Sequence, residues 1–310
     1  MKIKNKNGEL TTTQLVMLIV LIVSFVIILF LIFRLDLGKT TDKEICRNSV
    51  VTRGSSVLPT ESVPLKCQRS YLCLTKDGNC DSVPMTNPTI KKVKNEAEVY
   101  EVLSRELADC WWTFGEGEIN YVGSDMTSKL YCSICTQVAF DDSVNEIFSE
   151  GQIDKWEIYT YMQNHNVSGK DETYLYYLYG ENDLDELRAK LENQHLNFGP
   201  IDLNKQYYVM MGITSDVSTV GWVLAGAGLI SGVGLAIVFS PIVGTTWGIT
   251  SGIALISGVG GGAAAGGGLG TVLALTVEGL SGNDYISPAI VEANSQEFGA
   301  LKCKSITTLS

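Results

Sequence analysis

The segment EAEVYEVLSRELADCWWTF, from Glu96 to Phe114, decides the fold of the central part of this 310-residue chain. Its apolar residues recur at steps of three and four, the spacing of one face of an α-helix. They are Val99, Val102, Leu103, Leu107, Cys110, Trp111 and Phe114. Gly115 then acts as a helix stop. We predict a helix that buries this face, and we interpret Trp111 as a core residue rather than a ligand platform.

Segments rich in β-branched and aromatic residues lie on both sides of this helix and predict strands. They are Leu65 to Leu74, Ile119 to Val122, Leu130 to Phe140 and Tyr207 to Ile213. Two further segments, Gln152 to Asn164 and Asp183 to Leu196, have the pattern of helices. The run from Tyr174 to Tyr179 is interpreted as core with a semi-exposed patch. Together these elements predict an α+β domain over residues 34–216.

Cysteines are concentrated in the same domain. The eight are Cys46, Cys67, Cys73, Cys80, Cys110, Cys132, Cys135 and Cys303. An even count predicts four disulfides, although the sequence does not give their connectivity. The CxxC motif formed by Cys132 and Cys135 leaves a zinc site or a thiol-redox pair as alternatives. Zinc sites usually present two tight ligand pairs, and this chain has one, so structural disulfides are the favoured interpretation.

An apolar run, LVMLIVLIVSFVIILFLIF from Leu15 to Phe33, begins near the N-terminus. At about 1.5 Å rise per residue, a helix of ~20 residues crosses the ~30 Å hydrocarbon layer of a membrane. The run is longer than the apolar part of a secretory signal peptide, so we predict an uncleaved transmembrane anchor over residues 13–33. Lys2, Lys4 and Lys6 precede it and favour a cytoplasmic leader over residues 1–12.

The start of the chain resembles the N-termini of type IV pilin-like proteins. A short lysine-bearing leader is followed by Gly8 and Glu9 and then by the long apolar run. This resemblance implies an N-terminal anchor helix and cleavage after Gly8. The family's glutamate stands at the fifth mature position, which is Thr13 here. The lysine-rich start, apolar anchor and cysteine-bearing domain are also similar to uncharacterised membrane-anchored proteins of archaea.

A second uncharged block runs from Val217 to Val277 and holds 16 of the 31 glycines. We predict a transmembrane helical hairpin here, with spans at Val217 to Phe239 and Ile249 to Val277. Many of its glycines are four residues apart and would lie on one helix face, where helices pack closely. This spacing resembles glycine-zipper segments of membrane-inserting proteins. The glycines with this predicted packing role are Gly228, Gly232, Gly244, Gly248, Gly252, Gly258, Gly262, Gly266 and Gly270.

The predicted topology places the C-terminal tail, residues 278–310, on the outer side, where it packs on the middle domain. Cys303 then lies in the same oxidising compartment as the other cysteines, in which disulfides persist. Asn166, followed by Val167 and Ser168, matches the N-glycosylation pattern and is a candidate acceptor on this outer surface.

The sequence favours binding or assembly at the cell envelope, with membrane lipid, further copies or other envelope proteins as partners. A net charge of −11 without a basic run argues against nucleic acid. His165 and His195 are interpreted as surface residues, because no catalytic motif contains them. We therefore expect neither an enzyme nor a bound metal or cofactor. The alternative hypothesis is an oligomeric channel or membrane-permeabilising protein formed by the glycine-rich hairpin.

Overall fold

The computed structural model describes the chain in two compact units, Met1–Thr41 and Asp42–Ser310. The described residues are 12–34, 41–56, 62–85, 87–123, 130–180, 182–185, 200–214, 233–238, 251–258, 272–278, 284–295, 298–299, 301 and 303–305. Side chains are described for these residues except 12, 28–34, 233–238, 251–258, 272–278 and 284.

The first unit contains helix α1, Thr12–Arg34, which has 23 residues. Its large apolar side chains from Leu15 to Ile27 are between 48% and 74% exposed. Among the residues whose side chains are described, no helix has both the length and the hydropathy needed to cross a membrane.

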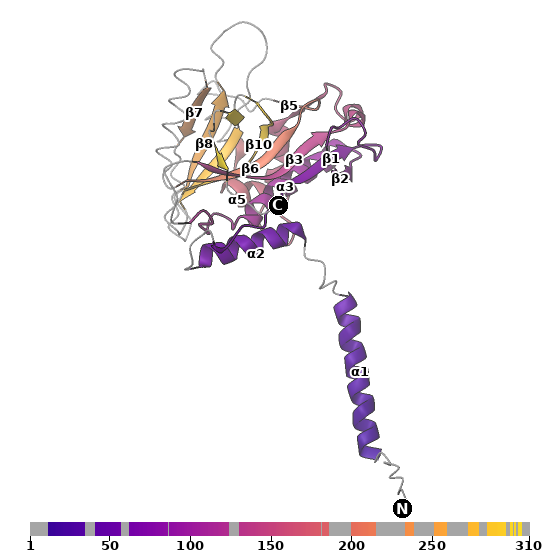
Figure 1. Ribbon diagram of the computed structural model, residues 1–310. Coiled ribbons are helices and arrows are strands. Elements are labelled where there is room, and N and C mark those ends of the chain that lie inside the picture. The colour runs from indigo at the N-terminus through magenta and orange to yellow at the C-terminus, as the bar shows by residue number, and fades with distance from the viewer. Residues whose placement is uncertain are drawn as a thin grey trace, which may run out of the picture. The chain divides into compact units, whose positions relative to one another are not determined.

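A mixed β-sheet forms the centre of the second unit (Figure 1). Its strands are β1 (Ser70–Thr75), β2 (Thr89–Lys92), β3 (Tyr131–Phe140), β6 (Tyr207–Thr214), β7 (Val233–Val238), β8 (Ser251–Gly258), β9 (Val272–Glu278), β10 (Asp284–Glu292) and β11 (Lys304–Ser305). The order is β2-β1-β3-β6-β10-β9-β8-β7, and β11 pairs with β3. Strands β2, β1 and β3 run parallel, and the pairs from β3 to β7 are antiparallel. Strands β4 (Gln152–Asp154) and β5 (Pro200–Asp202) form a separate pair.

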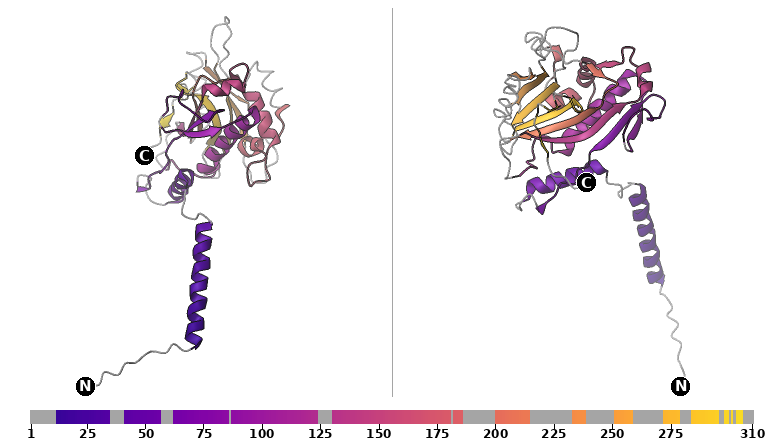
Figure 2. Two further views of the ribbon diagram at one scale, coloured as in Figure 1. Left: turned by 90° about the vertical axis from the view of Figure 1, so that its right-hand side faces the viewer. Right: turned by 45° about the horizontal axis from the view of Figure 1, so that its top comes forward.

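Helices cover one face of the sheet (Figure 2). The described helices of this unit are α2 (Asp42–Ser55), α3 (Glu96–Thr113), α4 (Lys155–Asn164), α5 (Tyr174–Tyr179) and the short 3-10 helix η2 (Asp142–Glu146). Helix α3 packs on β6 and β10 and also contacts α2, α4 and α5. The core of the unit therefore lies between this helical layer and the sheet.

Strand β6 is buried on both sides. Tyr207 and Val209 belong to the core under the helices. Tyr208 and Met210 alternate with them and lie in a second apolar cluster on the opposite face, together with Leu301 of the C-terminal tail. Every residue of the strand is buried, as expected for a central strand covered on both faces.

The predicted α+β class and the central helix are confirmed. Asn95 caps α3, because its side chain accepts a 3.0 Å hydrogen bond from the backbone N–H of Glu98. All seven residues of the predicted apolar face are buried, and Trp111 is only 4% exposed, so its interpretation as a core residue is also confirmed. The chain leaves the helix at Gly115, whose φ of +86° suits glycine.

The strand predictions are confirmed at Leu130 to Phe140 and Tyr207 to Ile213, which correspond to β3 and β6. In the segment Leu65 to Leu74, the strand begins only at Ser70. The strand predicted at Ile119 to Val122 is wrong. The side chain of Asn120 accepts the backbone N–H groups of two later residues, which makes a turn instead of a ladder.

The helix predicted from Gln152 starts late, at Lys155. Its first three residues form β4, and Asp154 then caps α4 by accepting a 2.9 Å hydrogen bond from the N–H of Trp156. Most of the helix predicted at Asp183 to Leu196 lies outside the described residues. The run Tyr174 to Tyr179 is helix α5, with four residues buried and two half-buried, as predicted.

The helical hairpin predicted for Val217 to Val277 is wrong wherever the structure describes this block. Residues 233–238, 251–258 and 272–278 are the antiparallel strands β7, β8 and β9, which extend the sheet beyond β10. Glycine disfavours helix by about 1 kcal/mol relative to alanine, and these runs are rich in valine, isoleucine and leucine. Gly252 and Gly258 lie in β8, where a four-residue spacing does not mark a helix face. Gly228, Gly232, Gly244, Gly248, Gly262, Gly266 and Gly270 lie outside the described residues.

Candidate functional site

The prediction of four disulfides is confirmed, and none of the eight cysteines is free. Two of the bonds hold helices: one joins α2 to the segment before β1, and another joins α3 to β3. A third closes the turn after β1, and the fourth ties the C-terminal tail to β3. The pairs are Cys46–Cys67, Cys73–Cys80, Cys110–Cys135 and Cys132–Cys303.

The two cysteines of the CxxC motif in β3, Cys132 and Cys135, do not form a disulfide with each other. Cys132 lies in the apolar cluster under the tail, whereas Cys135 packs against the helix-side core. The register of β3 against β6 shifts between Ile134 and Thr136, so the strand is irregular at Cys135. Each cysteine bonds to a distant partner, and the described residues contain no metal-binding group of histidine, cysteine and acidic side chains.

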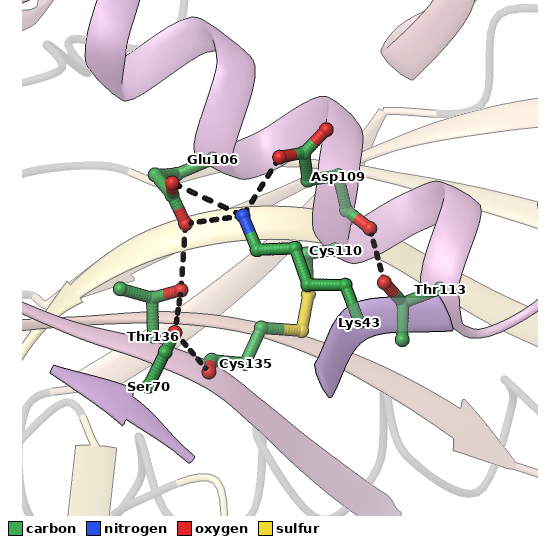
Figure 3. Close-up of polar contacts among 8 residues, drawn as sticks. All are labelled: Lys43, Ser70, Glu106, Asp109, Cys110, Thr113, Cys135 and Thr136. Atoms are coloured by element: carbon green, nitrogen blue, oxygen red, sulfur yellow. Dashed lines mark hydrogen bonds and ion pairs between the residues drawn. A yellow bond between two sulfur atoms is a disulfide. The ribbon is translucent and has the colours of Figure 1, made fainter. Parts of the chain in front are cut away.

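A charged and hydroxyl-bearing cluster lies beside the Cys110–Cys135 disulfide (Figure 3). The ammonium group of Lys43 on α2 lies 3.1 Å from the carboxylate of Glu106 and 2.7 Å from that of Asp109, both on α3. The Thr136 hydroxyl of β3 donates a 2.8 Å hydrogen bond to the same Glu106 carboxylate. Glu106 therefore joins α2, α3 and the sheet at one point.

Ser70 extends this cluster to the first strand of the sheet. Its hydroxyl lies 2.7 Å from that of Thr136 and 3.1 Å from the carbonyl oxygen of Cys135 (Figure 3). Burial opposes the charge on Lys43, but the Glu106 and Asp109 carboxylates outweigh it and raise the pKa of this ammonium group. Because its carboxylate is already paired with an ammonium group, Glu106 is not a free general base.

A cavity of about 90 Å³ opens at this cluster. Its wall includes two disulfides, Cys46–Cys67 and Cys110–Cys135, together with Lys43, Glu106 and Arg69. Pockets for metabolites usually measure about 300–1,000 Å³, so this cavity is the size of a single side chain. The arrangement suits recognition of one residue of a partner better than chemistry on a small molecule.

A second charged cluster forms around Glu116, just after α3. Its carboxylate accepts hydrogen bonds from Lys170 at 2.8 Å and from the Tyr177 hydroxyl at 2.6 Å, and Arg47 lies 3.3 Å away. Burial opposes ionisation of this carboxyl, but the bonds from Lys170 and Tyr177 and the charge of Arg47 hold its pKa below its ordinary value. The guanidinium of Arg47 also stacks over the ring of Trp112 at 4.4 Å.

The structure brings the predicted cysteines together in pairs, but it does not bring the other predicted site residues to either cluster. His165 is exposed, as predicted, and its ring stacks on that of Tyr161 with 3.8 Å between centroids. His195 lies outside the described residues. Asn166 is exposed, in the loop after α4.

Sequence reasoning missed both charged clusters. The only signal was the spacing of Glu106 and Asp109, which are three residues apart and so share a face of the predicted helix. Lys43 and Thr136 are brought to that face by tertiary contacts, which no local sequence pattern predicts.

Comparison of the chain with protein-family models, with curated proteins and with solved structures finds no match.

Proposed function

We propose that this chain is a membrane-anchored cell-envelope protein whose disulfide-linked domain lies outside the cytoplasm and acts in binding or assembly. The observation that carries the proposal is the pairing of all eight cysteines in one unit. Disulfides persist in oxidising compartments and are rare where thiols are kept reduced. A domain with four of them belongs on the outer side of a membrane or beyond it.

The apolar helix α1 supports the anchor. Its 23 residues correspond to about 35 Å at the rise of an α-helix, which exceeds the ~30 Å hydrocarbon layer. The run from Leu15 to Phe33 carries no charge, and exposed apolar side chains from Leu15 to Ile27 suit contact with lipid. Three lysines before the helix favour an N-terminus in the cytoplasm.

The cavity beside Glu106 supports a role in binding or assembly. Its lining combines charged groups, hydroxyls and apolar side chains around a space for one side chain. Rigid support comes from the two disulfides in its wall, which would spare a partner the cost of ordering the site. The described residues of the glycine-rich block are strands, so they do not support the alternative of a pore formed by a helical hairpin.

Thiol labelling of intact cells with a membrane-impermeant maleimide tests the placement of the domain. We expect no label without reductant and label on all eight cysteines, including Cys303, after reduction. Labelling that requires permeabilised cells would refute the outer placement, and labelling without reductant would refute the paired cysteines. Extraction of the chain from membranes by alkaline carbonate would refute the anchor.

Native electrophoresis of mild-detergent extracts tests binding or assembly. We expect the full chain to migrate in a complex that Glu106→Ala weakens, because this change removes the acceptor of Lys43 and Thr136. Glu101→Ala is the matched control, since Glu101 lies on the same helix and makes an exposed pair with Arg105. A monomer in every extract, or equal effects of the two changes, would contradict the proposed role.

A further inference from the structure

The loop between α4 and α5 is short and tightly held. The backbone N–H of Val167 donates to the carbonyl of Glu172 at 2.9 Å, and the N–H of Tyr174 donates to the carbonyl of His165 at 2.9 Å. These two bonds enclose a single antiparallel bridge between Asn166 and Thr173. In such a pair, the two enclosed residues direct their own N–H and C=O groups away from each other. The backbone of Asn166 therefore faces outward.

Side chains alternate along this extended stretch. Val167 is half-buried and packs against the helix-side core. Asn166 and Ser168, one residue to either side, are exposed. Extended backbone sends successive side chains to opposite sides, so the inward valine directs the carboxamide and the hydroxyl to the same outer side. No hydrogen-bond partner of either side chain is found among the described residues.

The turn that follows leaves room around these two groups. Gly169 has a φ of +78°, and a Cβ placed on it would meet no atom within 4 Å. The chain reverses there and returns to Thr173, which caps α5. The carboxamide and hydroxyl are thus presented at the tip of a surface loop, where a large group can be attached without displacing packed residues.

We propose that Asn166 is an N-glycosylation site that receives an oligosaccharide from a lipid-phosphate donor. The inference rests on the proposed function, because this modification takes place on the outer side of a membrane. In the transfer, the Asn166 amide nitrogen forms a bond to the anomeric carbon of the sugar. The anomeric C–O bond breaks, its electron pair leaves with the lipid phosphate, and the amide nitrogen loses one proton. No oxidant or reductant is involved.

The chain holds a natural comparison at Asn87. Asn87 and Thr89 are exposed around the half-buried Pro88, so their side chains are also presented outward. Proline at the middle position excludes recognition of this tripeptide. Asn166 is the remaining asparagine of the 310-residue sequence with serine or threonine two residues later. The expected stoichiometry is therefore one glycan per chain.

The test uses the full chain, translated with microsomes that contain an oligosaccharyltransferase and lipid-linked oligosaccharide. Each version carries an added Asn-Ser-Thr acceptor after Ser310, because the bond from Cys303 to Cys132 keeps the tail with the domain. We expect two glycosidase-sensitive glycans on the parent chain and one on Asn166→Gln or Ser168→Ala. Ser168→Thr retains both, since it keeps the hydroxyl. Peptide mass mapping should find Asn87 unmodified.

The outcomes separate this inference from the proposed function. A glycan on the added acceptor alone would overturn the assignment of Asn166 and leave the outer placement of the domain intact. Absence of glycan from both positions would overturn the outer placement and the modification together. A second glycan that survives Asn166→Gln would overturn the assignment to this loop.

Discussion

The four disulfides close loops of very different length, and this predicts a ranking of their contributions to stability. Cys132–Cys303 spans 171 residues of sequence, and Cys73–Cys80 spans seven. In the chain-entropy model, the stabilisation grows with the logarithm of loop length. It gives about 5 kcal/mol for the long loop and about 2 kcal/mol for the short one. Removing the long-loop bond should therefore cost more by about 3 kcal/mol.

Packing at the more buried cysteine of each pair does not give the same ranking. Cys73 is completely buried, whereas Cys132 is 8% exposed, so a cavity left by alanine at Cys73 is at least as costly. Any difference in packing loss between these two buried cysteines thus acts against the predicted order.

The assay is urea unfolding of the full chain in detergent, followed by tryptophan fluorescence, in which the buried Trp111 reports on the core. The double variants Cys132→Ala with Cys303→Ala and Cys73→Ala with Cys80→Ala are compared with the parent chain. Equal losses of the free energy of unfolding, or a larger loss for the short loop, would refute the reasoning. The parent chain with all disulfides reduced should be less stable than either variant.

Three other predictions test local features. Glu116→Gln should cost about 1–2 kcal/mol at neutral pH. The pKa of the Glu116 carboxyl is depressed in the folded chain, so its contribution to the free energy of unfolding is present above its unfolded pKa and is lost as the pH falls through its folded pKa. The urea midpoints of the parent chain and of Glu116→Gln should therefore converge on acidification. Asn95→Ala removes the cap of α3 and should cost about 1 kcal/mol in the same assay, whereas Asn95→Asp should not. Gly115→Ala should lower the thermal midpoint more than Gly169→Ala: both positions have positive φ, but only the first would place a Cβ 2.6 Å from Ile119. Equal midpoints would contradict that steric argument.

The elements that could be predicted from sequence are those whose signal is local. Helix α3 has a continuous stripe of apolar residues and a glycine at its end, and β3 and β6 are long β-branched and aromatic runs. Helix α2 was missed because few of its residues are apolar, and it is held by Cys46 and by ion pairs from Lys43 and Arg47. Those partners are more than 20 residues away, so no window of sequence contains the reason for the helix.

The same distinction explains the candidate site. The number of disulfides followed from an even cysteine count, but their pairing depended on which face of the sheet each cysteine occupies. Cys132 and Cys135 are close in sequence, but their side chains lie on opposite faces of the sheet because successive side chains of a strand alternate between the two faces. The hydroxyl of Thr136 meets Glu106 only after β3 has packed under α3.

The glycine-rich block shows how one pattern can support two structures. Glycines four residues apart suit close helix packing in lipid, but they are equally compatible with strands once an unpaired sheet edge is available. Strand β10 provides such an edge, since β6 occupies only one of its sides, and β9 pairs with the other through Glu278, Val277 and Thr276. The same pairing places the tail beside the middle domain. Cys303 bonds to Cys132, and the described residues of the glycine-rich block between them are strands of the sheet rather than the predicted spans.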